Sequence, residues 1–476
     1  MQTKEHDPRW ITLIVLCLAE LMIVLDTTIV NVALPSIQTD LQFSETSLVW
    51  VVNAYMLTFG GFLLLGGRLG DVYGQRVVFL CGLAVFTLAS LACGLASSQP
   101  MLIAARALQG LGGAVTSAIA LSLIMNVFSD PAEKAKAMGV YGFVCAGGGS
   151  VGVLLGGVLT SLLSWHWIFL VNIPIGILVY VQLARLLPET TKNGTSQKLD
   201  VWGAIAVTTA LMLAVYAIVN GNAVGWQSLQ TLWQLSLAIA LLVMFLLWEK
   251  RLEAKNIMPL MPLSMFKLRS ISVANTIAVL WAAALFAWFF ISALYMQLVL
   301  GYTPMQIGLG FLPSNLIMAA CSIGLSDKLV VKYGTSRPLA AGLLMAAAGL
   351  FLFALAPVGG TFNLHILPAM VLLGLGAGIA FNPMMLAAMD EVKESDSGLA
   401  SGLLNTAFMM GGALGLAVLA SAAQARSLAL SADGASKLAA LNGGYQWAFM
   451  LGGLCALVAA GLTVALPKNK TKGDSK

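Results

Sequence analysis

The chain has 476 residues, of which 59% are hydrophobic and only 9% are charged. Soluble globular domains carry roughly 25% charged residues, so this composition excludes a water-soluble globule and indicates an integral membrane protein. The formal net charge of +5 comes from loops and from the Lys-rich tail after Pro467. The charge therefore indicates membrane topology and implies no nucleic-acid partner.

Fourteen apolar stretches are long enough to cross a bilayer as helices, which takes ~20 residues each. In the first part of the chain they lie near residues 10–35, 47–67, 77–96, 100–126, 137–161, 167–187 and 200–220. In the remainder they lie near residues 231–248, 271–299, 305–326, 338–357, 364–389, 398–425 and 445–466. We expect no cleavable signal peptide, because the first stretch is too long for its apolar region. The sequence predicts an all-α integral membrane fold with 14 transmembrane helices.

Basic residues alternate between the gaps that separate these stretches. Of the 25 Lys and Arg, 22 lie in every second gap, Arg426 and Lys437 lie in the other gaps, and Arg106 lies inside an apolar stretch. Short loops rich in Lys and Arg stay on the cytoplasmic side. We therefore expect a multi-pass membrane protein with both termini in the cytoplasm.

The chain also repeats itself at a displacement of about 260 residues. Residues 69–74 match residues 329–334, and two glycine pairs match as well. Gly139, Gly148, Gly149 and Gly152 fall on Gly402, Gly411, Gly412 and Gly415 at a constant shift of 263 residues. We predict a six-helix bundle at 1–190, an inserted two-helix hairpin at 191–262 and a second six-helix bundle at 263–476. Parallel repeats are typical of transporters that rock around a substrate site near the membrane midplane.

Away from their ends, the apolar stretches contain three formal charges, at Glu20, Asp26 and Arg106. Each costs about 2.5–3.5 kcal/mol or more at a helix centre, so each should have a partner or face a water-filled cavity. At 1.5 Å per residue, Asp26 lies ~13 Å and Arg106 ~9 Å below the outer surface. The two charges are therefore deep enough in the membrane, and similar enough in depth, to meet.

These charges leave several interpretations open. If Arg106 moves relative to Asp26 during alternating access, the proton affinity of Asp26 changes with conformation, and the pair couples transport to protons. The alternative is a static ion pair between two helices. Glu20 lies about 120° around the helix from Asp26. It is a second proton carrier, a counter-charge for a cationic substrate, or a protonated acid hydrogen-bonded between helices.

The predicted inner loop between the second and third helices contains Gly67, Asp71, Gly74 and Arg76. Its glycines permit a tight reversal of the chain, and its charges lie at two helix ends. Asp71 and Arg76 either latch the loop to the other half in one conformation or act as topological anchors.

The fifth predicted helix contains Gly148, Gly152 and Gly156 at intervals of four residues, followed by Gly157. Glycines at this spacing share one face and let a neighbouring helix approach closely. We interpret this face as a packing and hinge surface.

Polar and aromatic positions within the spans are candidates for a substrate cavity. Aromatic faces beside a carboxylate suit a delocalised organic cation through cation–π attraction, although most such residues in a membrane protein face lipid or pack. The candidates are Asn53, Gln109, Tyr141, Trp281, Trp288, Asn405 and Phe408.

Several segments resemble the major facilitator superfamily, specifically its 14-helix drug:proton antiporter branch of the EmrB/QacA type. Residues 25–35, LDTTIVNVALP, are similar to the first-helix signature of that branch, in which the Asp is implicated in proton coupling. Gly67, Leu69, Asp71, Gly74 and Arg76 match the loop motif of the superfamily. Residues 106–110, RALQG, match the fourth-helix motif whose Arg is tied to proton transfer, and residues 165–174 are typical of the sixth helix.

Two departures from the family pattern matter. Val153 follows Gly152 where exporters normally have Pro, which weakens the inference of export over uptake. Residues 303–326 contain no acid, unlike some relatives that handle divalent cations, so a preference for dications is not implied. Glu20 is the candidate substitute for that missing acid.

With this resemblance, we predict a proton-coupled multidrug antiporter of the bacterial cytoplasmic (inner) membrane that exports lipophilic, cationic drugs and other toxic compounds by alternating access. The alternative is a dedicated exporter of one metabolite or antibiotic. An enzyme or a channel is disfavoured, since no cluster of catalytic groups stands out and paired repeats suit rocking. We expect no cofactor beyond the proton gradient and no metal site, because the six cysteines stand singly. A periplasmic adaptor is compatible with export, but no residue identifies one.

Overall fold

The computed structural model describes residues 8–128, 130–187, 199–255, 257, 259–392 and 397–467, and within these ranges the ordered segments are all helical. The first part of the chain forms α1 (Pro8–Leu41), α2 (Glu45–Tyr73), α3 (Gln75–Gly94), α4 (Gln99–Val127), α5 (Pro131–Leu162), α6 (Trp167–Leu170) and α7 (Asn172–Leu186). The next two helices are α8 (Val201–Val224) and α9 (Leu229–Ala254). The rest forms η1 (Leu263–Lys267), α10 (Arg269–Leu294), η2 (Tyr295–Val299), α11 (Pro304–Ala320), η3 (Cys321–Leu325), α12 (Ser326–Tyr333), α13 (Ser336–Ala354), η4 (Phe362–Ile366), α14 (Leu367–Met389), α15 (Ser397–Ala432), α16 (Lys437–Leu462) and η6 (Thr463–Ala465).

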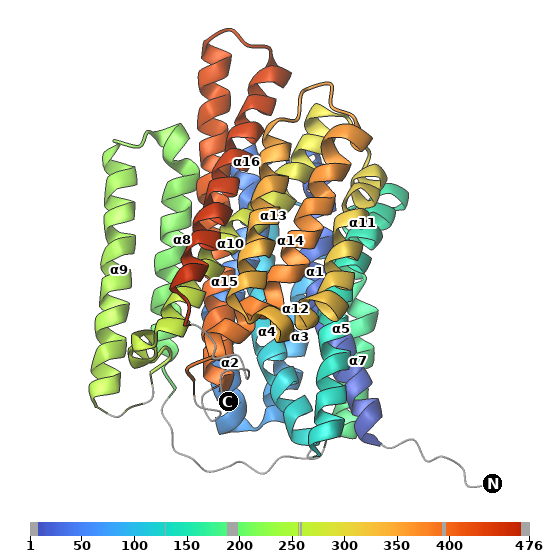
Figure 1. Ribbon diagram of the computed structural model, residues 1–476, viewed down its shortest axis with the longest axis vertical. Helices are drawn as coiled ribbons and strands as arrows, with labels where there is room; N and C mark the ends of the chain where they lie inside the picture. The colour runs from blue at the N-terminus through green and yellow to red at the C-terminus, as the bar shows by residue number, and fades with distance from the viewer. Residues whose placement is uncertain are drawn as a thin grey trace, which may run out of the picture.

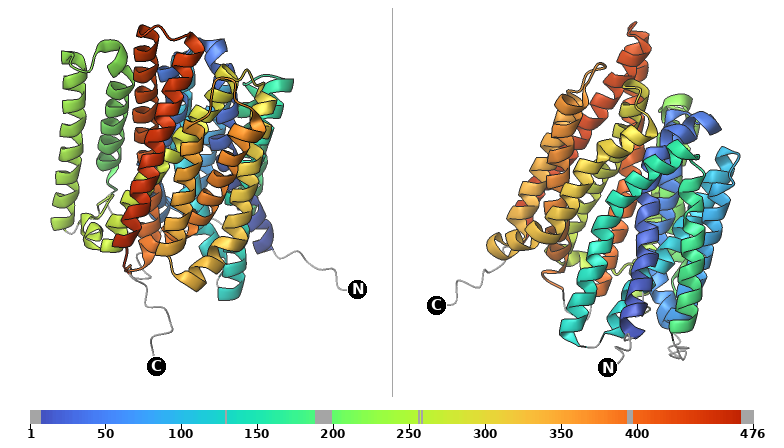
Figure 2. Two further views of the ribbon diagram at one scale, coloured as in Figure 1. Left: turned by 45° about the horizontal axis from the view of Figure 1, so that its top comes forward. Right: turned by 90° about the vertical axis from the view of Figure 1, so that its right-hand side faces the viewer.

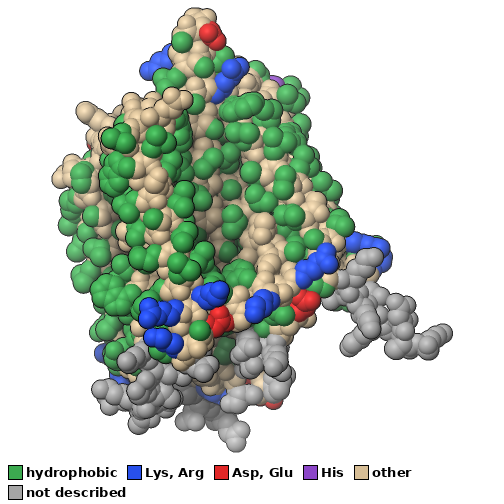
Figure 3. Space-filling view, turned by 90° about the vertical axis from the view of Figure 1, so that its left-hand side faces the viewer, with side chains coloured by type: hydrophobic (Ala, Val, Ile, Leu, Met, Phe, Trp, Pro, Cys, Tyr) green, Lys and Arg blue, Asp and Glu red, His purple; other side chains and the backbone are tan. Residues whose placement is uncertain are grey.

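These helices follow the order of the 14 predicted spans. Among the described residues, 12 helices are long and apolar enough to cross a membrane. The 32-residue α5 and the 17-residue α11 occupy the two remaining predicted places. A helix satisfies its backbone hydrogen bonds internally, which is required where no water is present. Hydrophobic side chains cover the middle of the face in Figure 3, and Lys and Arg gather near its lower edge.

The repeat seen in the sequence reappears in the way the helices pack. A Cβ atom at Gly110 of α4 would lie 2.3 Å from the Tyr55 carbonyl oxygen in α2, and one at Gly112 would lie 2.5 Å from a backbone nitrogen of α3. In the other half, α14 makes the corresponding approaches through Gly374 to α11 and Gly376 to α13. Each half therefore wedges its fourth helix between its second and third at positions that only glycine allows.

The glycine face of α5 packs against α1. Gly148, Gly152 and Gly156 lie against successive turns of α1, and a Cβ at Gly156 would be 2.7 Å from the Ile29 carbonyl oxygen. Gly411 and Gly415 of α15 lie against α10 in the same manner. The first and fifth helices of each half thus form equivalent pairs, while the domain boundaries at 190 and 262 stay predictions.

Two seams join the halves. On one seam, a Cβ atom at Gly157 of α5 would lie 3.0 Å from the Pro304 carbonyl oxygen of α11. On the other, α2 packs along α15, where Gly60 meets Met409 and Met410. Helix α8 lies against both α2 and α15, and α9 packs on α8 at the outside of the molecule (Figures 1 and 2). The inserted hairpin therefore covers the second seam.

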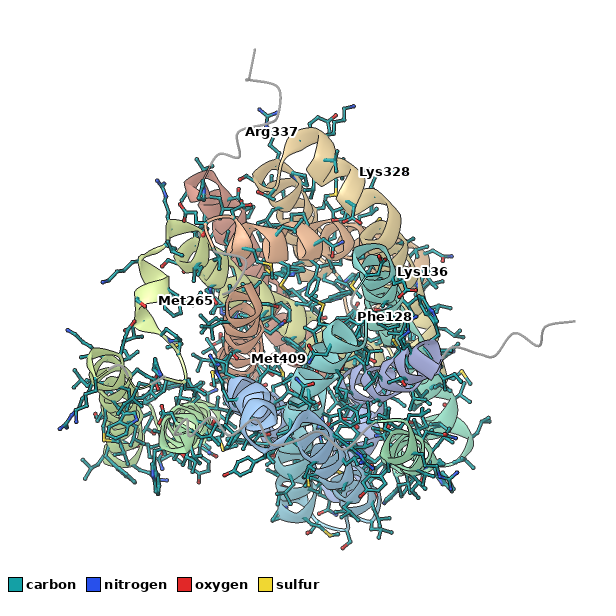
Figure 4. The ribbon with its side chains drawn as sticks, turned by 90° about the horizontal axis from the view of Figure 1, so that it is seen from below. Phe128, Lys136, Met265, Lys328, Arg337 and Met409 are labelled. Carbon is teal, nitrogen blue, oxygen red and sulfur yellow. The ribbon has the colours of Figure 1, made fainter. Side chains whose placement is uncertain are left out.

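The described chain begins with α1 and ends after η6 at the same lower end of the molecule (Figure 2). Figure 4 views this end and shows Lys136 of α5, Lys328 of α12 and Arg337 of α13 around it. Basic residues far apart in the sequence thus share one side of the protein. The assignment of this side to the cytoplasm stays a prediction.

Candidate functional site

The centre of the candidate site is an ion pair between Asp26 of α1 and Arg106 of α4. Arg106 donates through Nη1 to Asp26 Oδ2, and the two side chains are 1% and 0% exposed, respectively. The guanidinium also donates through Nε to the Val51 carbonyl oxygen at 2.9 Å and through Nη1 to Gln109 Oε1 at 2.7 Å. The structure thus brings together the two charges whose depths match in the sequence.

Two amides complete the surroundings of Asp26 Oδ1. Gln109 donates to it through Nε2 at 2.6 Å, and Asn172 of α7 donates through Nδ2 at 3.1 Å. The Ser90 hydroxyl accepts from Gln109 at 2.9 Å and donates to the Phe86 carbonyl oxygen at 2.8 Å. A buried ion pair is stable only when further hydrogen bonds satisfy both partners. Residues from α2, α4 and α7 supply them here, and Ser90 of α3 holds Gln109 in place.

An aromatic ring lies against the guanidinium. The Arg106 Cζ atom is 4.4 Å from the centroid of the Tyr55 ring and 5.6 Å from that of Phe169. Such cation–π contacts hold a charge in place where water is excluded. The Tyr55 hydroxyl points toward α4, 3.0 Å from the position of a Cβ at Gly113, and has no hydrogen-bond partner among the described residues.

Glu20 forms a separate site, which lies farther along α4 than Arg106 does. Ser117 donates its hydroxyl to Glu20 Oε1 at 3.1 Å, and Tyr141 of α5 is a second polar neighbour. Arg106, Gly113 and Ser117 are spaced by 7 and 4 residues and therefore share one face of α4. One side of α4 carries the partners of both buried carboxyl groups, and Glu20 has no ion-pair partner in the described part of the chain.

The predicted cavity residues do not form one group. Trp281 and Trp288 are buried in α10, where the Trp288 ring lies 6.2 Å from that of Phe311. Asn53 is buried at the seam between the halves and donates to the Ala413 carbonyl oxygen at 2.9 Å. Gln109 belongs to the ion-pair cluster instead of the aromatic group, because its amide joins Asp26 to Arg106.

The remaining candidates lie near the helices that join the halves. Phe408 of α15 is buried beside Phe286 of α10 and Phe381 of α14, with ring centroids 5.8 and 6.1 Å away. Asn405 and Tyr141 are half-buried. The contact of a substrate with any of these residues stays a prediction.

The predicted latch between the loop after α2 and the other half stays a prediction. Arg76 donates through Nη2 to the Ala184 carbonyl oxygen of α7, within the first half. Gly74 has φ of 92°, a value that a residue with a side chain rarely adopts, and it joins α2 directly to α3. Gly67 has open space around it. The side chain of Asp71 lies outside the described part of the chain.

Four residues of the site were missed by the sequence reasoning: Tyr55, Ser90, Ser117 and Asn172. All are polar groups inside apolar spans, and this was the available signal. The chain contains many such groups, so the signal does not select these four. Only the helix packing shows which of them face Asp26, Arg106 and Glu20.

Comparison with known proteins decides the family. Residues 16–416 match the family model described as Major Facilitator Superfamily. The chain belongs to the major facilitator superfamily. It is therefore a multi-pass membrane transporter, and the all-α membrane fold and the family predicted from the sequence are confirmed, while the count of 14 transmembrane helices stays a prediction.

Characterised relatives of this transporter are resistance and export proteins. The chain is 38% identical to the puromycin resistance protein of Streptomyces alboniger, covering 98% of this chain and 93% of that protein. It is 38% identical to the cephamycin export protein CmcT of Amycolatopsis lactamdurans, covering 88% and 86%. It is 36% identical to the multidrug resistance protein Stp of Mycobacterium tuberculosis, covering 86% and 75%.

Solved structures agree on the fold at lower sequence identity. A bacterial homologue of the human lysosomal transporter Spinster, in an inward-facing and unoccupied conformation, has a TM-score of 0.68 at 15% identity and covers 97% of both chains. A peptide transporter of the POT family has a TM-score of 0.66 at 14% identity, covering 94% of this chain and 96% of that one.

Proposed function

We propose that the chain is a proton-coupled antiporter that exports lipophilic, cationic toxic compounds across the bacterial cytoplasmic membrane by alternating access. The ion pair between Asp26 and Arg106, buried within the membrane, is the observation that carries the proposal. The resistance and export functions that the relatives are named for support the outward direction and toxic compounds as substrates. The proton gradient is the energy source in this proposal, and no cofactor takes part.

The proposed coupling follows from the partners of Asp26. With Asp26 ionised, Arg106 ties α4 to α1, and two amides add hydrogen bonds. Protonation removes the negative charge and with it most of the attraction, which is strong in a low-dielectric site. Arg106 then keeps only its bonds to Val51 and Gln109. The proton thereby weakens the contact between two helices of one half.

The site is closed in the conformation described here. Asp26 has no exposed surface, so the proton reaches it only after the helices rearrange. This requirement suits an antiporter, because a carboxyl group open to both sides of the membrane would leak protons. Alternating access is thus proposed to open Asp26 to one side at a time.

Glu20 is the second acid of the proposal. It lies six residues, or ~9 Å, before Asp26 along α1 and has its own partners. As a proton carrier it would raise the number of protons per cycle, whereas as a counter-charge it would select cations. Replacement by Gln separates the two roles: the first predicts a lower proton stoichiometry for every substrate, and the second a loss of transport for cations alone.

The test is exchange in proteoliposomes with an imposed pH gradient. Asp26→Asn should abolish proton-driven export while the protein remains folded. Asp40→Asn is a matched control on the same helix, because Asp40 accepts a hydrogen bond from Trp165 Nε1 at 2.8 Å near the outer end of α1. Full exchange by the Asp26 variant would refute the proposed coupling.

The second candidate function is a dedicated exporter of one antibiotic or metabolite. It is favoured by relatives whose names specify one compound, puromycin or cephamycin. The two functions differ in competition: unrelated dyes and quaternary ammonium compounds should inhibit each other's export only in a multidrug transporter.

A further inference from the structure

Two carboxyl groups face each other at the base of the inserted hairpin. Asp200 directly precedes α8, and Glu249 lies near the end of α9. The position of a Cβ atom at Gly203 is 2.1 Å from Asp200 Oδ2 and 2.7 Å from Glu249 Oε1. The two oxygens are therefore at most about 4.8 Å apart, the sum of these two distances. Gly203 leaves room for both because it has no side chain.

The other oxygen of each carboxyl group is engaged and holds the group in place. Asp200 Oδ1 accepts the backbone N–H of Gly203 at 3.0 Å, which caps α8, and the indole N–H of Trp248 at 2.9 Å. Glu249 Oε2 accepts the backbone N–H of Met261 at 2.8 Å. Neither carboxyl group can turn away from the other without breaking these bonds.

The two facing oxygens lack any such partner. Asp200 Oδ2 and Glu249 Oε1 are buried and accept no hydrogen bond from the described residues, and Glu249 is 0% exposed. From the segments packed around Glu249, which are α8, α9 and residues 259–262, Asp200 is the titratable group that interacts with it. Two ionised carboxylates in this position repel each other, and one shared proton removes the repulsion.

We propose that Asp200 and Glu249 bind one proton between them, and that this proton fastens the hairpin to the segment that enters the second half. The proton is carried on one of the facing oxygens and donated to the other. Its release to water leaves two negative charges. Their repulsion moves Glu249 away from Asp200 and breaks the bond to Met261.

The position of the site gives the proton a structural effect. Met261 is two residues before η1, which leads into α10, and Figure 4 places Met265 of η1 between the hairpin and the second half. Leu260 packs with Phe245 of α9 and Leu65 of α2 in a small hydrophobic cluster. Because α8 covers the seam between α2 and α15, proton occupancy sets how firmly the hairpin is held there. The site lies at the end assigned to the cytoplasm by the Lys and Arg pattern, apart from Asp26.

Amide hydrogen exchange of the full-length protein in nanodiscs tests this proposal. Protection of the Met261 amide, corrected for the intrinsic effect of pH on exchange, should fall at least about tenfold between about pH 6 and about pH 9. In the Glu249→Gln variant, the Met261 amide should remain protected at both pH values, because the side-chain N–H of the glutamine takes the place of the shared proton. The Asp200→Asn variant should behave in the same way. Agreement between the two variants excludes misfolding of one of them as the cause.

Glu253→Gln is the matched control. Glu253 lies one turn later on α9 and accepts the backbone N–H of Ser264 at 3.2 Å, so this variant should respond to pH as the natural protein does. Equal protection at both pH values in the natural protein would overturn the proposal. A loss of protection in Glu249→Gln at high pH would also overturn it. Restoration of protection at high pH by added Na⁺ or Mg²⁺ would overturn it as well, because it would assign the site to a metal ion.

Discussion

The hydroxyl of Tyr445 in α16 lies 3.3 Å from Glu45 Oε2 at the start of α2, and this hydrogen bond links the two halves of the transporter. It lies at the end of the molecule opposite the termini, where α2 begins. Along the same helix, Asn53 makes another hydrogen bond between the halves, to the Ala413 carbonyl oxygen. A rocking motion that opens this end has to break the bond between Tyr445 and Glu45.

Tyr445→Phe should therefore shift the population toward the conformation open at that end. One hydrogen bond contributes about 0.5–1.5 kcal/mol net, so the ratio of the two conformations should change by roughly two- to tenfold. Distances between spin labels on the outer ends of α2 and α16 measure this ratio. Gln446→Met is the control, because Gln446 donates to the Ala356 carbonyl oxygen within its own half and should leave the ratio unchanged.

Arg106→Lys should strongly slow proton-driven exchange although the positive charge is retained. Lysine cannot reproduce the planar fork by which Arg106 reaches Asp26, Gln109 and Val51 together. We expect a loss of at least about tenfold in exchange rate in proteoliposomes, since each lost charged hydrogen bond costs about 1.5–3 kcal/mol. Near-normal exchange by this variant would show that the geometry of the guanidinium is not needed.

Tyr55→Phe and Tyr55→Leu should differ because the ring, and not the hydroxyl, contacts Arg106. The Phe variant keeps the cation–π contact and removes a hydroxyl that has no partner in the described structure. The Leu variant loses the contact, which contributes about 0.5–2 kcal/mol. Transport assays should find the Phe variant close to the natural protein and the Leu variant several-fold slower. Equal rates for both variants would show that the aromatic ring of Tyr55 does not contribute to transport.

Gly156→Ala should destabilise the first half. Its Cβ would lie 2.7 Å from the Ile29 carbonyl oxygen of α1, a backbone atom that cannot move aside cheaply. We expect a loss of about 1–3 kcal/mol, measured as a lower unfolding temperature in detergent. Gly149→Ala is the control on the same helix, since its Cβ would meet only an ordinary contact at 3.7 Å. Similar unfolding temperatures for the two variants would contradict the close approach of α1 and α5.

Much of the architecture follows from linear features of the chain. A bilayer of fixed thickness selects long apolar stretches, and a repeat leaves matching glycines, as at Gly152 and Gly415, so spans and halves are readable without coordinates. Depth is readable too, because a helix rises by a constant amount per residue. This is why Asp26 and Arg106 could be paired in advance.

The direction in which each side chain points was settled by helix packing. Gln109 joins Asp26 and not the aromatic residues, Arg76 bonds to Ala184 in its own half, and Asn172 reaches Asp26 from 146 positions away. Hydrophobicity that continues around a whole helix does not indicate which side faces a neighbour. The rotation of each helix depends on the close contacts of small residues with other helices. Those contacts, together with the placement of α8 on the seam between α2 and α15, exist only in the folded protein.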